Sequence, residues 1–290
     1  MKLLLTDSSH SLGVAIEHEL EREPFNLLQP ARADIDWRDA NAVAEYIAAQ
    51  RPDIVINTLG WGDSSISADT DLLPVAAHNV AAACANHGIV MVQLSSYRVF
   101  GDDNKSKHSD TDECAPNSEL GQAFYQAEQA VLRSQEKVLV LRTSWLIAGY
   151  GDNRLTHLLQ ALDGDRVWQL NTRLRGAPTA LSDLARITVA IIKQMNCGAD
   201  CWGIYQYCSG DACNQVEFAE QLWEALRQQG YQGGEPHWDV IDETPQGEPV
   251  SAVLSSLKLR NDFGVQSRTW RTYLVPIIKQ WLSSKTGADQ

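Results

Sequence analysis

The first residues whose types and spacing could do chemistry form a polar turn from Asp7 to Ser11. A short apolar run, Lys2 to Thr6, precedes this turn, and apolar residues between Leu12 and Leu20 recur at helical spacing. The sequence therefore predicts a strand, a tight turn and a helix. Because main-chain N–H groups at a helix N-terminus point outward and carry partial positive charge, such a turn is able to bind a phosphate group.

The turn lacks two of the glycines that let a main chain approach the pyrophosphate of a dinucleotide. When Thr6 to Gly13 is aligned with the pattern T-G-x-x-G-x-x-G, Asp7 and His10 replace the first two glycines, and only Gly13 is kept. The last glycine allows close packing of helix on strand, whereas the first two serve the ligand. A carboxylate about 5 Å from a pyrophosphate would cost roughly 3 kcal/mol at an effective dielectric constant of about 20. A protonated His10 would offset part of that cost, and a solvated turn is the simpler interpretation of this residue.

The elements that must position this turn alternate between strand and helix along the first half of the chain. Further strands are predicted at 25–28, 53–60, 89–95 and 137–147, and further helices at 39–50, 75–87 and 119–135. This alternation predicts an α/β fold with a Rossmann-like, doubly wound parallel sheet. The intervening segment 101–117 is predicted to be a polar loop too hydrophilic to pack.

The second half of the chain predicts a smaller lobe, with a boundary near Gly149. Residues 1–149 are expected to form the dinucleotide-binding domain and residues 150–290 the substrate-binding lobe, with exchange of sheet and helix segments between the lobes left open. Helices are predicted at 154–162, 184–195, 215–229 and 270–281, a strand at 203–209 and a frayed tail at 285–290. Ser182 or Asp183 is the predicted N-cap of the second of these helices.

Composition narrows the classes of partner. The net charge of −13 argues against nucleic acid and anionic membrane as partners, because both require clustered basic residues. The apolar run at the N-terminus is too short for a signal peptide, so a cytoplasmic protein with reduced thiols is expected. The six cysteines fit no usual zinc spacing, so neither a metal site nor a disulfide is predicted.

Several stretches together resemble the dTDP-4-dehydrorhamnose reductases, a family of extended short-chain dehydrogenases/reductases. They are LLLTDSSHSLG, RPDIVINTLG, SSYRVFGD, VLVLRTSWLIAG, RGAPTALSDLA, GIYQYCSGD and EPVSAVLSSLKLRNDFG, in the order and spacing of that family. The resemblance implies a Rossmann domain followed by a smaller C-terminal lobe that holds a nucleotide sugar. The regulatory β subunit of methionine adenosyltransferase is similar to the same family, which implies that the scaffold is able to bind a protein partner.

The resemblance also implies a catalytic Ser or Thr, a Tyr that donates a proton as hydride arrives, and a Lys that lowers the Tyr pKa. Ser96 keeps the hydroxyl position. The family pattern Y-G-x-S-K-x-x-x-E-x-x-V matches LGQAFYQAEQAV, which puts Leu120 at the Tyr position and Phe124 at the Lys position. Neither side chain is able to give or hold a proton, so this sequence resembles a degenerate member of the family.

Two other tyrosines are candidate stand-ins for the missing proton donor. Tyr125 is one residue from Phe124, which is a rotation of about 100° on a helix, so the two side chains should point in different directions. Tyr97 follows Ser96 at a position where the family has Asp. A structural role is the favoured interpretation of both tyrosines, as a half-buried helix residue and a packing residue.

The remaining candidate binding residues are family positions in the two lobes. In the first lobe Asp34 matches an Asp beside the adenine, and Asn57 and Asn79 match family Asn residues; turn or packing roles are the alternatives. Candidates for substrate binding in the second lobe are Trp145, Arg175, Thr179 and Glu248. Glu248 replaces an Arg of the family, and this charge reversal puts a diphosphate contact in doubt.

Taken together, these departures predict a reductase-like pseudoenzyme that binds a ligand or a regulatory protein partner without catalysis. The alternative is an active NAD(P)H-dependent reductase of a nucleotide sugar with a rearranged site. Bound cofactor is expected to be absent or weakly held NADP(H) or NAD(H). The expected partner is a protein or a nucleotide sugar, and homo-oligomer formation is left open.

Overall fold

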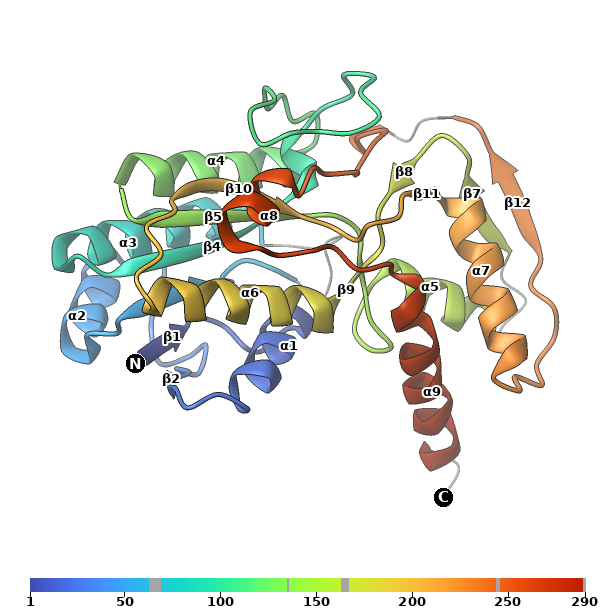
Figure 1. The fold of residues 1–290 in the computed structure, drawn as a ribbon, viewed down its shortest axis with the longest axis horizontal. Helices are drawn as coiled ribbons and strands as arrows, with labels where there is room; N and C mark the ends of the chain where they lie inside the picture. Colours follow the sequence, from blue (N-terminus) through green and yellow to red (C-terminus); the bar gives the residue numbers. More distant parts are fainter. Residues whose placement is uncertain (63–68, 135, 163–166, 244–245, 289–290) are drawn as a thin grey trace.

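The computed structural model describes residues 1–62, 69–134, 136–162, 167–243 and 246–288, with side chains through Ser284. A large sheet with helices on both faces occupies one end of the molecule, and a smaller lobe built around α5, α7, β7 and β12 occupies the other (Figure 1). This arrangement confirms the predicted fold class.

The large sheet is parallel throughout. Its strands are β1 (Lys2–Leu5), β2 (Asn26–Leu28), β3 (Ile54–Asn57), β4 (Val90–Ser96), β5 (Val138–Thr143) and β10 (Gly203–Tyr207), in the order β10-β5-β4-β3-β1-β2. Every residue of β3 and β5 is buried, as expected for central strands covered on both faces. The sheet is completed by β10, which lies beyond residue 149, so the large sheet draws on both halves of the sequence.

Helices cover the two faces of this sheet in separate groups. They are α1 (Ser11–Leu20), α2 (Ala40–Gln50), α3 (Leu72–His87), α4 (Glu119–Ser134) and α6 (Leu181–Asn196). The first packs against α6, whereas α3 contacts both α2 and α4. Figure 1 shows α1 beside α6, with α4 and α3 at the upper left of the view and α2 at its left edge.

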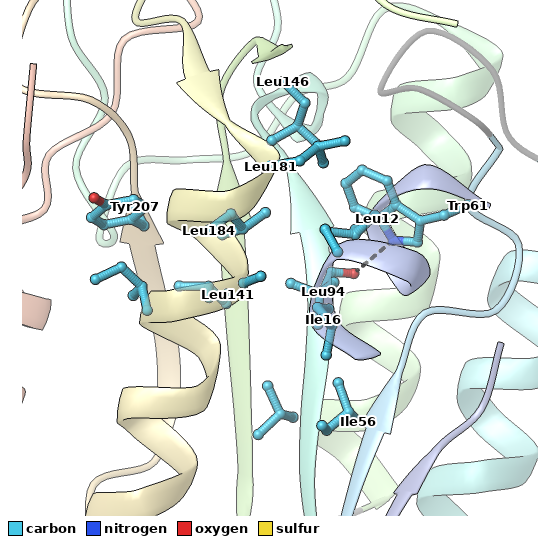
Figure 2. Close-up of a cluster of buried hydrophobic side chains, with 14 of the residues drawn as sticks. Leu12, Ile16, Ile56, Trp61, Leu94, Leu141, Leu146, Leu181, Leu184 and Tyr207 are labelled. Atoms are coloured by element: carbon cyan, nitrogen blue, oxygen red, sulfur yellow. Dashed lines mark hydrogen bonds between the residues drawn. The ribbon is translucent and has the colours of Figure 1, made fainter. Parts of the chain in front are cut away.

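The core lies where α1 and α6 meet the sheet. Figure 2 shows Leu12 and Ile16 of α1 beside strand residues such as Leu94, with Leu181 and Leu184 of α6 reaching the same layer. The indole of Trp61 closes this layer near the carboxyl ends of the strands, and its Nε1 donates to Leu94 O at 3.3 Å. The apolar recurrence in residues 12–20 therefore buries one face of α1, as its spacing predicts.

The smaller lobe consists of short strand pairs and helices. Its elements are β6 (Leu146–Ile147), α5 (Arg154–Ala161), β7 (Trp168–Asn171), β8 (Arg175–Gly176), β9 (Thr179–Ala180), β11 (Cys213–Asn214), α7 (Gln215–Gln228), β12 (Trp238–Ile241) and α9 (Arg271–Ala288). The short helix α8 (Leu257–Phe263) packs instead against β10 of the large sheet (Figure 1). The pairs are β6 with β9, β7 with β12 and β8 with β11. Across one pair, the rings of Trp168 and Trp238 stack with centroids 5.8 Å apart.

Several predicted boundaries were wrong. The third helix begins at Leu72 rather than at residue 75, and the single strand predicted at 137–147 is divided into β5 and β6. The last helix continues to Ala288, so most of the predicted frayed tail is helical. Gln135, which was included in the predicted helix at 119–135, lies outside the described residues.

The polar segment 101–117 packs more closely than predicted. His108 is 1% exposed, its ring stacks on Phe100 at a centroid distance of 4.1 Å, and its Nε2 lies 3.1 Å from Asp103 Oδ1. The main chain of His108 also forms a β-bridge with Leu254. The prediction failed because one histidine with an aromatic and a carboxylate neighbour is enough to anchor an otherwise hydrophilic loop.

Asp183 has a different role from the predicted N-cap. The α6 helix begins at Leu181, and the buried Asp183 carboxylate accepts hydrogen bonds from Tyr207 Oη, from Tyr273 Oη at 2.6 Å and from Arg186 Nη2 at 2.7 Å. Burial and the adjacent Asp183 charge raise the pKa of Tyr207, so this hydroxyl stays a donor. The carboxylate thereby joins α6, β10 and α9.

The Asp183→Ala variant should lose about 3 kcal/mol of the free energy of unfolding, because three donors lose a charged acceptor. Chemical denaturation followed by circular dichroism measures this loss. The matched control is Asp211→Ala, which removes a 2.9 Å pair with Arg271 whose side chains are 45% and 42% exposed; it should lose less than about 1 kcal/mol. Equal losses in the two variants would contradict this role of Asp183.

Candidate functional site

The candidate site begins at the point where the strand order of the large sheet reverses. Strand β1 lies between β2 and β3, and the turn from Thr6 to His10 leaves its carboxyl end directly into α1. Ligands of open α/β sheets bind outside the carboxyl ends of the strands at such a point. The structure therefore confirms the predicted strand, turn and helix.

His10 fills the centre of this turn. It is the N-cap of α1: its Nδ1 accepts a hydrogen bond from the Gly13 N–H at 3.2 Å, and its Nε2 lies 3.0 Å from Thr58 O. Because Nδ1 accepts, the ring proton is on Nε2, which donates to the carbonyl, and the imidazole is neutral. The interpretation of His10 as part of a solvated turn was wrong, since the residue is 4% exposed.

Asp7 closes the other side of the turn. Its Oδ1 accepts hydrogen bonds from the Ser9 N–H at 2.8 Å and from Ser9 Oγ at 2.6 Å, while Asp7 O accepts from Thr58 Oγ1 at 2.7 Å. The carboxylate is thus held by the residues that follow it. Main-chain donors at Ser9 and Gly13 are engaged by side chains of the turn itself.

Gly13 is required for packing. A Cβ atom at this position would lie 2.3 Å from Asp7 O and 2.6 Å from Ser8 Cα, far inside van der Waals contact. The helix therefore crosses the turn too closely for any side chain here. This geometry agrees with the role expected of the last glycine of the pattern.

The other predicted cofactor positions make turn and packing contacts. Asp34 is exposed and its Oδ2 accepts from the Ala31 N–H at 2.9 Å. The fully buried Asn57 donates from Nδ2 to Gln93 Oε1 at 2.7 Å. Asn79 Nδ2 donates to the main-chain oxygen of Trp37 at 3.0 Å.

The two positions predicted to match the family's Tyr and Lys hold packed apolar side chains. Phe124 is 1% exposed, and its ring lies edge-on to Trp61 with centroids 4.9 Å apart. Leu120, one turn earlier in α4, is half-buried against the core. Ser96 is fully buried, and its Oγ accepts from the Arg98 N–H at 3.3 Å at the start of the short helix η1 (Tyr97–Val99). The retained hydroxyl therefore caps a local turn.

The two candidate tyrosines lie in different environments. Tyr97 is fully buried and donates from Oη to Glu248 Oε1 at 2.6 Å. Burial and then the Glu248 charge raise its pKa, whereas a general acid works best with a pKa near the operating pH. Tyr125 is half-buried and borders a surface hollow with His78 and Arg133, so it points away from the buried Phe124, as helix geometry predicts.

Glu248 brings together two arginines that the sequence did not single out. Its Oε2 lies 2.6 Å from Arg98 Nη1, and its Oε1 lies 2.6 Å from Arg154 Nη2. Arg98 follows β4 in the large-sheet lobe, whereas Arg154 opens α5 in the smaller lobe. No periodicity or motif relates residues 98, 154 and 248, so only the folded chain reveals the cluster.

Trp145 and Thr179 lie behind this cluster. The Arg154 guanidinium carbon is 4.6 Å from the centroid of the Trp145 ring, a cation–π contact. A Cβ at Gly176 would lie 2.2 Å from this indole, so the glycine makes room for it. Thr179 donates from its main chain to Trp145 O at 2.6 Å, and the exposed Arg175 pairs through its main chain with the 250–252 segment.

Two adjoining cavities in the smaller lobe share Arg154, Gln169 and Gln215. They have volumes of about 150 Å³ and 270 Å³. The first is also bordered by Trp145, His157, Leu158, Leu170 and Phe218, and the second by Asn171, Leu174, Ile241, Glu243 and Glu248. We call this pair of cavities the second-lobe cleft. Its lining of aromatic rings, amides and a few charges is typical of a small-molecule site.

Two further features concern membranes and metals. Among the helices in the described ranges, none is long and apolar enough to cross a bilayer. The part of the chain that the structure describes contains no group of three or more His, Cys, Asp or Glu side chains arranged to hold a metal ion.

The parallel sheet, the turn at its reversal point and the smaller lobe define a Rossmann-like α/β protein. The sequence model of the family "RmlD substrate binding domain" matches residues 1–283, so the chain belongs to that family. This result confirms the resemblance seen in the sequence.

Known relatives are similar over nearly the whole chain. The dTDP-4-dehydrorhamnose reductases of Aggregatibacter actinomycetemcomitans and Sinorhizobium fredii are 22% and 24% identical, covering 94% and 93% of this chain and 97% and 94% of their own. A crystal structure of a Clostridium acetobutylicum dTDP-4-dehydrorhamnose reductase superposes with a TM-score of 0.83 at 24% identity, covering 97% of this chain and 99% of that one. The Bacillus anthracis enzyme in complex with NADP gives 0.82 at 22% identity, covering 96% and 98%.

The Gly13→Ala variant should lose about 1–3 kcal/mol of the free energy of unfolding, because its methyl group would overlap the Asp7 carbonyl. Urea denaturation measures this loss. Gly234→Ala is the matched control: an added Cβ there meets no atom within 4 Å, and the change should stay within about 0.5 kcal/mol. A Gly13→Ala variant as stable as the control would show that helix and turn are not tightly packed.

Proposed function

We propose that this chain is a non-catalytic member of its family, in which the turn that would bind a cofactor is closed by its own side chains. The observation that carries this proposal is the hydrogen bond from the Gly13 N–H to His10 Nδ1. A pyrophosphate at the helix N-terminus would need such donors, and the imidazole lies where it would approach. The residues of this turn therefore do not fit NADP(H) or NAD(H).

The catalytic positions support the same proposal. Phe124 has no charge to lower a tyrosine pKa or hold a ribose, and its ring is packed against Trp61. Burial and the Glu248 charge raise the pKa of Tyr97, and its hydroxyl donates its proton in a hydrogen bond to Glu248. Loss of a positioned proton donor alone lowers a rate by roughly a hundred- to ten-thousand-fold.

The ligand site that we propose is the second-lobe cleft. The stacked Arg154 and Trp145 and the amides of Gln169 and Gln215 supply an aromatic wall and hydrogen-bonding groups. We propose that a small molecule related to the sugar part of a nucleotide sugar binds there, or that a protein partner covers the cleft. Binding without turnover would make the chain a ligand sensor or a regulatory subunit.

An active NAD(P)H-dependent reductase of a nucleotide sugar is the second candidate. Family membership favours it, since relatives that span the whole chain are named as dTDP-4-dehydrorhamnose reductases. This candidate requires that the His10 ring leave Gly13 on cofactor binding and that a proton donor come from another residue.

Titration of the protein with NADPH or NADH should give no saturable quenching of tryptophan fluorescence at cofactor concentrations up to about 1 mM, which corresponds to a binding free energy weaker than roughly −4 kcal/mol. Turnover of dTDP-4-dehydrorhamnose should stay at background. The chain has nine tryptophans, so a bound nicotinamide would be readily detected. Saturable turnover that disappears in Tyr97→Phe or Tyr125→Phe would contradict the proposal and establish a rebuilt active site.

Restoration of the catalytic pair alone should not restore activity. The Leu120→Tyr/Phe124→Lys variant keeps the closed turn, so it should bind NADPH no better than wild type. Adding Asp7→Gly and His10→Gly should improve cofactor affinity at least about tenfold, equivalent to roughly 1.4 kcal/mol. Isothermal titration calorimetry compares these variants with Asp7→Gly/His10→Gly alone, which should gain affinity without turnover. Equal affinity in closed and opened turns would show that His10 is no barrier.

A further inference from the structure

The carboxylate of Glu248 lies at the centre of a three-donor cluster. Tyr97 Oη, Arg98 Nη1 and Arg154 Nη2 each lie 2.6 Å from one of its oxygens. The Arg98, Glu248 and Arg154 side chains are only 8%, 13% and 19% exposed. Two guanidinium groups and a hydroxyl that converge on a shielded anion form the kind of arrangement that proteins use to bind a phosphate or carboxylate ligand. Here the chain itself supplies the anion.

This cluster borders the second-lobe cleft. Glu248 and Arg154 both line its larger cavity, and Arg154 also lines the smaller one while lying over Trp145. A ligand in the cleft would therefore meet an arginine whose charge is already matched. Glu243 adds a second carboxylate at the border of the same cavity, so the charges of Arg98, Arg154, Glu243 and Glu248 cancel.

We propose that Glu248 is a specificity-determining residue that keeps phosphate groups out of the second-lobe cleft by taking their place between Arg98 and Arg154. This inference rests on the proposal that the cleft is the ligand site, and it narrows the ligand class. The part of a ligand that lies against Arg154 is uncharged, because a phosphate there would be repelled by Glu248 and would have to displace it. A hydroxyl-bearing group, able to hydrogen-bond the Gln169 and Gln215 amides, satisfies this condition.

The polar contacts of the cleft agree with an uncharged ligand group. Gln215 Oε1 accepts a hydrogen bond from the Asn171 N–H at 2.8 Å, so the NH₂ group of this amide points away from Asn171. Gln169 Nε2 lies 3.4 Å from Asp239 Oδ2. Side-chain amides donate and accept equally well, so they suit hydroxyl groups. Of the described residues, one positive side chain, Arg154, lines the larger cavity, and it is paired with Glu248. Glu243, which also lines this cavity, is negative and would repel an anionic ligand.

Pyrophosphate titration of wild type, Glu248→Gln and Glu243→Gln tests this proposal at constant ionic strength. Tryptophan fluorescence reports binding, since Arg154 covers Trp145, and thermal unfolding reports it independently. Glu243→Gln is the matched control because it removes the same charge from the same cavity. We expect Glu248→Gln to bind pyrophosphate at least about tenfold more tightly than the other two, a change of roughly 1.4 kcal/mol.

Two results would overturn the proposal. One is Glu248→Gln binding pyrophosphate no more tightly than Glu243→Gln. The other result comes from comparing folded wild type with the Arg154→Gln variant. If wild type binds pyrophosphate saturably and Arg154→Gln abolishes this binding, Glu248 does not exclude phosphate. Failure of the proposed function is distinguishable, because cofactor binding at the turn would depend on Asp7 and His10 and not on Glu248 or Arg154.

Discussion

The hydrogen bond from the Gly13 N–H to the His10 imidazole is the interaction on which the candidate site depends. The first N–H groups of a helix have no partner within the helix, and a phosphate ligand is one way to satisfy them. Here the N-cap side chain does so, and the same ring donates to Thr58 O, which links α1 to the end of β3. Likewise, the Asp7 carboxylate accepts hydrogen bonds from the N–H and the hydroxyl group of Ser9. Side chains of the turn itself therefore engage the N–H groups of Ser9 and Gly13.

Because side chains of the turn accept hydrogen bonds from its own N–H groups, the stability of the fold does not depend on a bound cofactor. The packing glycine, the buried strands and the α1 core face are those of a Rossmann-like fold. At the same time, the Phe124 ring packs against Trp61 at the position predicted for a lysine, and the Glu248 carboxylate lies between Arg98 and Arg154 beside the second-lobe cleft. Each replacement fills or neutralises a place that a charged ligand would use, and each adds local contacts. Under the proposed function, the scaffold has kept its fold and changed its ligand.

The sequence predicted the fold through local patterns and missed contacts that join distant segments. Strand and helix alternation, the packing role of Gly13 and the direction of Tyr125 all follow from spacing over a few residues, and the structure agrees with them. The burial of His10 depends on Thr58, and the Glu248 cluster unites residues 98, 154 and 248. Asp183 resembles a helix cap in sequence, but Tyr207 and Tyr273 approach it only in the folded chain. Such long-range polar contacts leave no periodic signal.

Nuclear magnetic resonance of His10 and the Gly13 amide, without and with NADPH, tests the central claim most directly. A closed turn predicts a neutral imidazole protonated on Nε2, a Gly13 amide protected from solvent exchange, and no change in either signal when NADPH is added. Loss of the bond between Gly13 and His10, with a saturable shift of the Gly13 amide on NADPH addition, would contradict the account. That result would mean that the imidazole is a displaceable gate over a working cofactor site.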